Sequence, residues 1–175
     1  WNLSNRTQNS SAMAKTILVP TDLQVGSLNA LKAALYGNGK DGVKVILMHA
    51  VHPPDGITDL LFYSPRKAVR EQTGPAFKEA LAVIRNHFEH RIASMEIVPF
   101  HGITQTAFDQ FLSANGVEEI HLSGAYEMRL HDRAMDPMPF IRKAKVELRE
   151  HGQAVAAQTG QAHPNLDHLQ LLFER

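Results

Sequence analysis

Cysteine is absent from this 175-residue chain, which excludes disulfides, thiol nucleophiles and cysteine-ligated metals. The absence fits a reducing compartment, and we expect a cytoplasmic location. Long apolar runs are also lacking, since no segment approaches the ~20 residues that a membrane helix needs. Neither sign of charge is in excess, because 18 basic residues balance 18 acidic ones. We therefore expect neither a membrane nor a nucleic acid as partner.

The first 12 residues are polar and lack the apolar middle of a signal peptide. We expect 1–12 to be a disordered tail or an expression remnant. A single domain is expected over 13–175, because a chain of this length can bury roughly 70% of its unfolded surface in one core.

Short apolar segments alternate with helical patterns along the chain. Strands are predicted at Thr16–Pro20, Val43–Val51, Met95–Phe100 and Glu119–Ser123. Helices are predicted from Ser27, whose hydroxyl is expected to cap the helix, then over Arg66–His90 with an interruption at Gly74–Pro75, over Thr104–Asn115 and over Phe140–His151. Strands that alternate with helices indicate a parallel sheet with right-handed crossovers.

The end of the chain leaves the fifth strand open. Either Gln153–Gln158 or His168–Phe173 supplies it, and the second has the better strand composition. The fold class predicted is α/β, a three-layer sandwich with a mostly parallel five-stranded sheet and about four helices. The connection 54–67 carries apolar residues, which indicates either a short helix or flap packed on its own core, or an oligomer contact or a lid over the strand ends.

Candidate site residues follow the strands, because ligands of open α/β sheets bind beyond the carboxyl ends of the strands. The candidates for binding a nucleotide are Pro20, Thr21, Asp22, Val51, Gly102 and Gly124. Structural alternatives remain for several of them. Asp22 can accept N–H bonds in its own turn, and the glycines can serve tight turns.

Four segments resemble the universal stress protein family, in its order and spacing. They are Ile17–Asp22 with Ser27–Leu31, Leu47–Val51, Phe100–Gly102 and Gly116–Gly124. The resemblance covers about residues 15 to 150. It implies a Rossmann-like open sheet, a homodimer formed through the last edge strand, and a stress or regulatory role. It also places Asp22 where nucleotide-binding members have an acidic residue near adenosine.

The glycine loop that holds phosphates in ATP-binding members of that family is altered here. Gly124 matches its first glycine, but Glu127 and Pro137 replace the next two and Met138 replaces the hydroxyl residue. A carboxylate at Glu127 repels phosphate, and a proline offers no backbone N–H. Arginines of the loop 125–139 either contact a phosphate in another geometry or are solvated. The resemblance thus favours the branch that does not bind ATP.

Histidines are numerous, but no metal site is predicted. His87 and His90 share a helix face without a third ligand, and His49 fits a hydrogen-bonded core position. His101 and His121 follow or lie near strand ends and are expected to line the crevice.

No catalytic set can be assigned from the sequence. A dyad of Ser123 with His121 is not expected, on the argument that successive strand residues point to opposite faces.

The sequence therefore predicts a non-enzymatic, homodimeric, universal-stress-type regulatory protein without a cofactor. The alternative is an AMP- or ATP-binding module that uses the crevice beside Asp22. A weak nucleotide hydrolase is the third possibility. Nothing in the sequence identifies a protein client or a stress signal.

Overall fold

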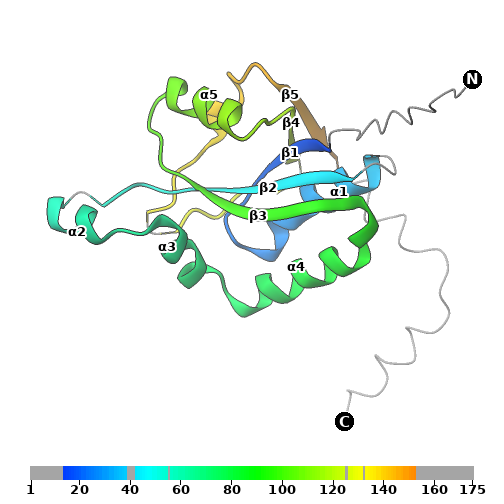
Figure 1. Ribbon diagram of the computed structural model, residues 1–175, viewed down its shortest axis with the longest axis horizontal. Helices are drawn as coiled ribbons and strands as arrows, with labels where there is room; N and C mark the ends of the chain where they lie inside the picture. Colours follow the sequence, from blue (N-terminus) through cyan, green and yellow to red (C-terminus); the bar gives the residue numbers. More distant parts are fainter. Residues whose placement is uncertain (1–13, 39–41, 55, 125, 132, 153–175) are drawn as a thin grey trace, which may run out of the picture.

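A computed structural model describes residues 14–38, 42–54, 56–124, 126–131 and 133–152. Its strands form one five-stranded parallel sheet in the order β3-β2-β1-β4-β5. The strands are β1 (Lys15–Pro20), β2 (Val43–Ala50), β3 (Ile92–Phe100), β4 (Glu119–Ser123) and β5 (Glu147–His151). The predicted α/β class is confirmed, and β1 occupies the centre of the sheet (Figure 1).

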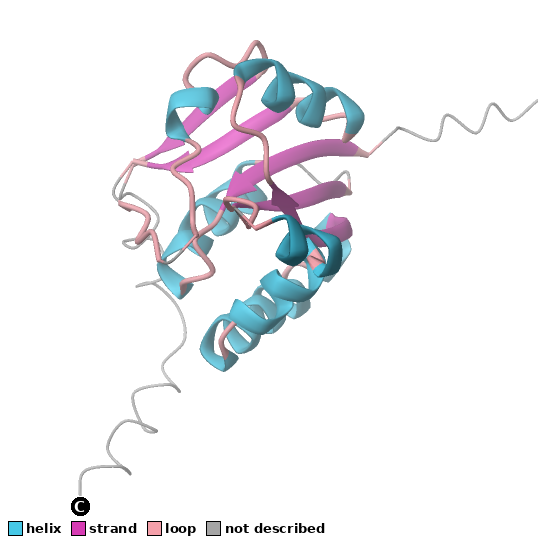
Figure 2. Ribbon diagram, turned by 90° about the vertical axis from the view of Figure 1, so that its left-hand side faces the viewer, coloured by secondary structure: helices cyan, strands magenta, loops and turns pink. Residues whose placement is uncertain are grey.

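Helices cover both faces of this sheet (Figure 2). On one face lie α1 (Leu28–Gly37), α3 (Pro65–Gln72) and α4 (Pro75–His87), and on the other lie α5 (Gln105–Ala114) and α6 (Met138–Ile141). A short helix, α2 (Ile57–Phe62), and two 3₁₀ turns, η1 (Val25–Ser27) and η2 (Glu89–Arg91), complete the described elements. The expected interruption of the helix after β2 is confirmed, since α3 and α4 separate at Thr73 and Gly74.

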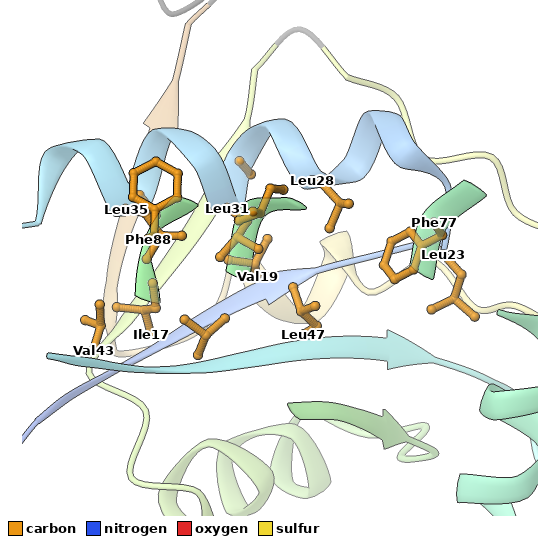
Figure 3. Packing of buried hydrophobic residues seen from close by; sticks show 14 of the residues in the cluster. Ile17, Val19, Leu23, Leu28, Leu31, Leu35, Val43, Leu47, Phe77 and Phe88 are labelled. Atoms are coloured by element: carbon orange, nitrogen blue, oxygen red, sulfur yellow. The ribbon is translucent and has the colours of Figure 1, made fainter. Parts of the chain in front are cut away.

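The continuous apolar runs of β1 and β2 explain the two cores. Alternate residues of each strand enter opposite layers, so Ile17 and Val19 pack beneath α1 and α4 while Leu18 and Ile46 pack beneath α5. Figure 3 shows the cluster on the α1 side of the sheet, in which Leu31 and Leu35 of α1 pack against β1. Each fully buried side chain of this size stabilises the fold by roughly 1.5–3 kcal/mol.

The prediction of a helix over Phe140–His151 is wrong. Only α6 is helical there, and Glu147–His151 forms β5, parallel to β4 in the register Glu119↔Glu147 to Ser123↔His151. Good helix formers fill this segment, but pairing with β4 overrides their propensity. The fifth strand is thus neither of the two candidates, and both Gln153–Gln158 and His168–Phe173 lie outside the described residues.

Ser27 does not cap α1 as expected. It lies in η1 with helical backbone angles, and its hydroxyl donates to the carbonyl of Gln24 at 2.7 Å instead of accepting from the helix. The hydroxyls of Ser27 and Thr21 also lie 2.7 Å apart. Ser27 therefore fixes the turn after β1 rather than the start of the helix.

The connection 54–67 contains α2, which extends away from the sheet in Figure 1. Ile57, Leu61 and Phe62 expose their side chains, Phe62 to 86%. The short helix expected here is present, but these three side chains do not pack on the core.

Candidate functional site

The candidate site lies where the chain changes direction across the sheet. From β1 the chain steps outward to β2 and β3, and later returns to β4 and β5 on the other side. Ligands of open α/β sheets bind at this switch point, beyond the carboxyl ends of the two central strands. A pocket of about 410 Å³ lies there. Its lining is Pro20, Ser27, Ala30, His121, Leu122, Ser123, Gly124, Tyr126, Glu127, Met128, Leu130, Asp136, Met138, Arg142 and Glu150.

Asp22 is beside this pocket, but donors of the chain itself occupy its carboxylate. The backbone N–H of Gln24 donates to Oδ1 at 3.0 Å. The Tyr126 hydroxyl and the backbone N–H of Arg129 both donate to Oδ2 at 2.7 Å. The Asp22 side chain is consequently buried, with 5% of the residue exposed. Both structural and binding roles were open for this residue, and its contacts here are structural.

Tyr126 holds this arrangement against the turn after β1. A Cβ added to Gly26 would lie 2.2 Å from Cε2 of Tyr126, so only glycine leaves room for the ring. Burial, together with the bond to Asp22, raises the pKa of Tyr126 to about 12. The phenol therefore stays protonated at neutral pH and donates to the carboxylate. Sequence reasoning missed Tyr126, because its partner is 104 residues away.

The loop after β4 continues from Tyr126 across the ends of β1 and β2. The N–H of His52 donates to the carbonyl of Arg133 at 2.7 Å, and Met135 donates to the carbonyl of Ala50 at 2.9 Å. Val51, a candidate site residue, forms an antiparallel bridge with Ala134. The carboxyl end of β2 is thus covered by backbone of the same chain.

The other candidates are divided between the pocket and the packing around it. Pro20 and Gly124 line the pocket, whereas Thr21 accepts the N–H of Leu23 at 3.0 Å. Gly102 has a packing role, because an added Cβ would lie 2.5 Å from Cζ of Phe100 and 2.7 Å from Cβ of Ala107. The structure therefore does not gather the six candidates into one open site.

Residues at the altered phosphate-loop positions lie around the same pocket. Glu127 and Met138 line it, and Pro137 precedes α6. Arg142 is the only cationic residue of the lining, which also holds Asp136 and Glu150. This charge balance disfavours a polyphosphate.

A buried ionic network lies at the β4–β5 side of the pocket, and sequence reasoning missed it. Glu119, 1% exposed, is paired with Lys15 of β1 and with Arg149 of β5, the latter at 2.7 Å. Its Oε2 lies 3.0 Å from Nε2 of His121, and Nδ1 of His121 lies 2.8 Å from Nε2 of His151. Three strands are joined through one carboxylate.

The contact between Glu119 and His121 corrects the argument about Ser123. Residues two apart in a strand share a face, so the alternation of successive residues does not separate Ser123 from His121. Ser123 also pairs in register with His151. No hydrogen bond joins Ser123 to either ring within the described residues, so a serine–histidine dyad has no contact to support it.

The network fixes how its histidines titrate. Burial lowers the pKa of His121, and burial with the nearby Arg149 charge lowers that of His151. Burial alone would raise the pKa of Glu119, but hydrogen bonds from Lys15 and His121 and the charge of Arg149 outweigh it, so this pKa is lowered. A hydrogen bond between Nδ1 of His121 and Nε2 of His151 holds one proton. The two rings therefore cannot both be cationic while this bond persists.

The remaining histidines have separate surroundings. His49 is a buried, hydrogen-bonded core histidine as expected, with Nδ1 donating to the carbonyl of Thr21 at 2.9 Å. His101 lies outside the pocket lining and faces the ring of Tyr63, with centroids 6.0 Å apart. His87 packs on Phe88. Among the described residues, no group of three or more potential ligands is placed to hold a metal.

Comparisons with known proteins identify the fold. The chain is similar to hypothetical protein MJ0577, with 18% identity, 81% of this chain and 97% of that chain covered, and a TM-score of 0.50. It is also similar to the universal stress protein UspA from Lactobacillus plantarum, with 12% identity, 78% and 96% coverage and a TM-score of 0.49. A universal stress protein solved in complex with cAMP matches at 14% identity, 78% and 96% coverage and a TM-score of 0.45.

The sequence matches no protein-family model, and the comparison with curated proteins gave no match. At 18% identity the likeness to MJ0577 shows the fold alone, an open α/β sheet of the Rossmann-like type. Within the described part of the chain, no helix is both long and apolar enough to cross a membrane.

Proposed function

We propose that this protein is a non-enzymatic, universal-stress-type regulatory protein of the cytoplasm that does not bind ATP tightly. The fold and its structural neighbours support the class. The observation that carries the proposal is the occupied carboxylate of Asp22, which the Tyr126 hydroxyl and the Arg129 N–H satisfy at 2.7 Å each.

Energetics favour the occupied state. A nucleoside that used Asp22 would have to displace two hydrogen bonds to a charged group, each worth roughly 1.5–3 kcal/mol. Displacing one of them costs about tenfold in affinity, because 1.4 kcal/mol is a factor of ten in an equilibrium constant. The exposed Glu127 on the pocket wall would then repel the phosphates. Both halves of a nucleotide site are therefore unfavourable.

Calorimetric titration with ATP, AMP and adenosine tests the proposal. The unaltered protein is expected to bind none of them at micromolar concentrations. In Tyr126→Ala, the space beside Gly26 opens and one donor to Asp22 is lost, so adenosine affinity should rise by about tenfold. ATP should gain less than adenosine, since Glu127 and Pro137 remain. Tyr36→Ala, on a tyrosine packed against Phe88 at the other end of α1, is the matched control.

The alternative function is a nucleotide-binding module, and the 410 Å³ pocket at the switch point is the observation in its favour. Micromolar binding of AMP or ATP by the unaltered protein, weakened in Asp22→Asn, would replace our proposal by this one. Nucleotide binding that is unchanged in Asp22→Asn would mean that the ligand binds elsewhere, and it would contradict both proposed functions.

We also propose a homodimer formed through β5. This strand ends the sheet, and four of its five residues are exposed. An edge strand offers a row of unpaired backbone groups that a second copy can pair with. Light scattering is expected to give twice the 19.5 kDa of one chain, and Leu148→Pro, which removes an edge N–H, should reduce it. A mass of 19.5 kDa for the unaltered protein would contradict the dimer.

A further inference from the structure

A second pocket lies at the opposite edge of the sheet from β5. It has a volume of about 300 Å³ and lies between α3, α4 and the edge strand β3. Its lining is Arg66, Val69, Arg70, Thr73, Lys78, Leu81, Glu96 and Ile97. In Figure 1, α3 and α4 run below β3, on the side of the sheet away from α5. We call this hollow the β3 groove.

The β3 groove reaches the edge of the strand itself. Glu96 and Ile97 are neighbours in β3 and therefore point to opposite faces of the sheet, yet both line the groove. The groove therefore borders β3, which lies at the edge of the described sheet. Within the described residues β3 pairs only with β2, so its outward N–H and C=O groups have no strand partner there. Backbone groups of an edge strand recruit another extended chain.

Cationic side chains surround this edge. Arg66 and Arg70 lie one turn apart on α3, and Lys78 projects from α4. None of the three forms an ion pair with another described residue, whereas Lys67 on the same helix is paired with Glu71 at 3.9 Å. Glu96 is the single carboxylate of the lining. The groove thus has an excess of positive charge on a chain whose net charge is zero.

The floor of the groove is apolar. Val69 is buried in the core, and Leu81 and Ile97 are partly buried against it. An inorganic anion gains nothing from such a floor, whereas an extended peptide places alternate side chains on it. A row of backbone hydrogen bonds with alternating pockets is how strand addition recognises peptides.

We propose that the β3 groove binds an acidic, extended segment of a partner protein, which adds to β3 as a sixth strand. Its acidic side chains pair with Arg66, Arg70 and Lys78, and its apolar side chains pack on Leu81 and Ile97. A second copy of this chain does not fit, because a two-fold contact would set these cations against their own equivalents. This site is separate from the pocket beside Asp22 and does not depend on whether a nucleotide binds there.

Fluorescence anisotropy with a labelled nine-residue peptide, equal in length to β3, tests the proposal. Its odd positions alternate between Glu and Val and its even positions are Thr, so that acidic and apolar side chains share the face turned to α3 and α4. The peptide is expected to bind saturably and more weakly as salt rises. Arg70→Glu should weaken it by at least about tenfold, since one charge-assisted pair is lost and one repulsion is gained. Lys78→Glu should act similarly from the other helix. Lys67→Glu, the same charge change on α3 outside the lining, should change affinity by less than about twofold.

Two further probes separate backbone pairing from charge attraction. A peptide with N-methyl groups on alternate amides keeps its charges but cannot pair as a strand, and it should bind at least about tenfold more weakly. Hydrogen exchange should show new protection of β3 amides on binding. Equal binding of the methylated peptide, or competition by inorganic phosphate alone, would reduce the site to an ion site and overturn the proposal. Equal losses of peptide affinity in Lys67→Glu and Arg70→Glu would also overturn the proposal. So would the finding that Arg70→Glu dissociates a dimer of this protein, because the groove would then bind a second copy.

Discussion

Replacing Glu119 by alanine is expected to lower the free energy of unfolding by about 3–5 kcal/mol, because it removes one partner of a buried ionic network. The His121 ring would lose the acceptor of its Nε2–H bond in a place where water does not reach. Lys15 and Arg149 are partly exposed, so their unpaired charges turn to solvent at lower cost. Domains of this size are stable by only about 5–15 kcal/mol, so urea unfolding will show the loss clearly.

Glu147→Ala is the matched control for this prediction. Glu147 also pairs with Arg149, at 3.0 Å, but its side chain is 59% exposed. Exposed ion pairs contribute about 0–1 kcal/mol, so this variant should stay close to the unaltered protein. Equal losses in the two variants would mean that burial of Glu119 does not govern the strength of the network.

Acidification is expected to destabilise the protein in two steps. The pKa values of His121 and His151 are lowered in the folded state from the usual 6.5, so their contribution to stability is complete above pH 6.5. It is lost as the pH falls from 6.5 through the folded values, because the unfolded chain then binds more protons. The lowered pKa of Glu119 adds a second loss below its usual 4.5. Urea midpoints should therefore stay level from about pH 7.5 to 6.5, fall as the pH drops below 6.5, and fall further below about pH 4.5.

The variant His151→Gln tests whether the pair of histidine rings causes the loss of stability at acidic pH. Glutamine cannot take up a proton, so the decline between about pH 6.5 and 5 should become shallower. His121, whose pKa burial still lowers, and His101, which lies outside the network and whose pKa burial also lowers, supply the slope that remains. An unchanged slope in His151→Gln would show that the pair does not couple stability to pH.

Much of the fold could be predicted because β1 and β2 carry apolar runs bounded by turn residues, and α5 (Gln105–Ala114) is capped by Thr104 and Asn115. The failure at β5 has a physical cause. Most residues from Lys143 to Arg149 favour a helix, whereas Glu147–His151 form a strand because they pair with β4. A weak signal was present, since Val146 and Leu148 alternate with charged residues over a short span, as in a strand with one polar face.

The candidate site was predicted by position rather than by contact. The crevice at the ends of β1 and β4 was inferred from the order of elements, and a pocket is there. What fills the place beside Asp22 could not be inferred, because Tyr126 and Arg129 reach it from more than 100 residues away. The same holds for Glu119, whose partners come from three strands. A charged residue inside an apolar strand indicates a buried partner but does not say which residue it is.

The central position of β1 has a consequence for how the chain emerges from the ribosome. Of the described strands β1 is made first, yet its pairing with β4 joins Ile17 to Glu119, so one edge of β1 stays open until β4 has been synthesised. During that interval the nascent chain exposes a strongly apolar strand edge, the kind of surface that promotes association between unfinished chains. Protection during synthesis is therefore a requirement built into the order of strands, separate from the stability of the finished sheet.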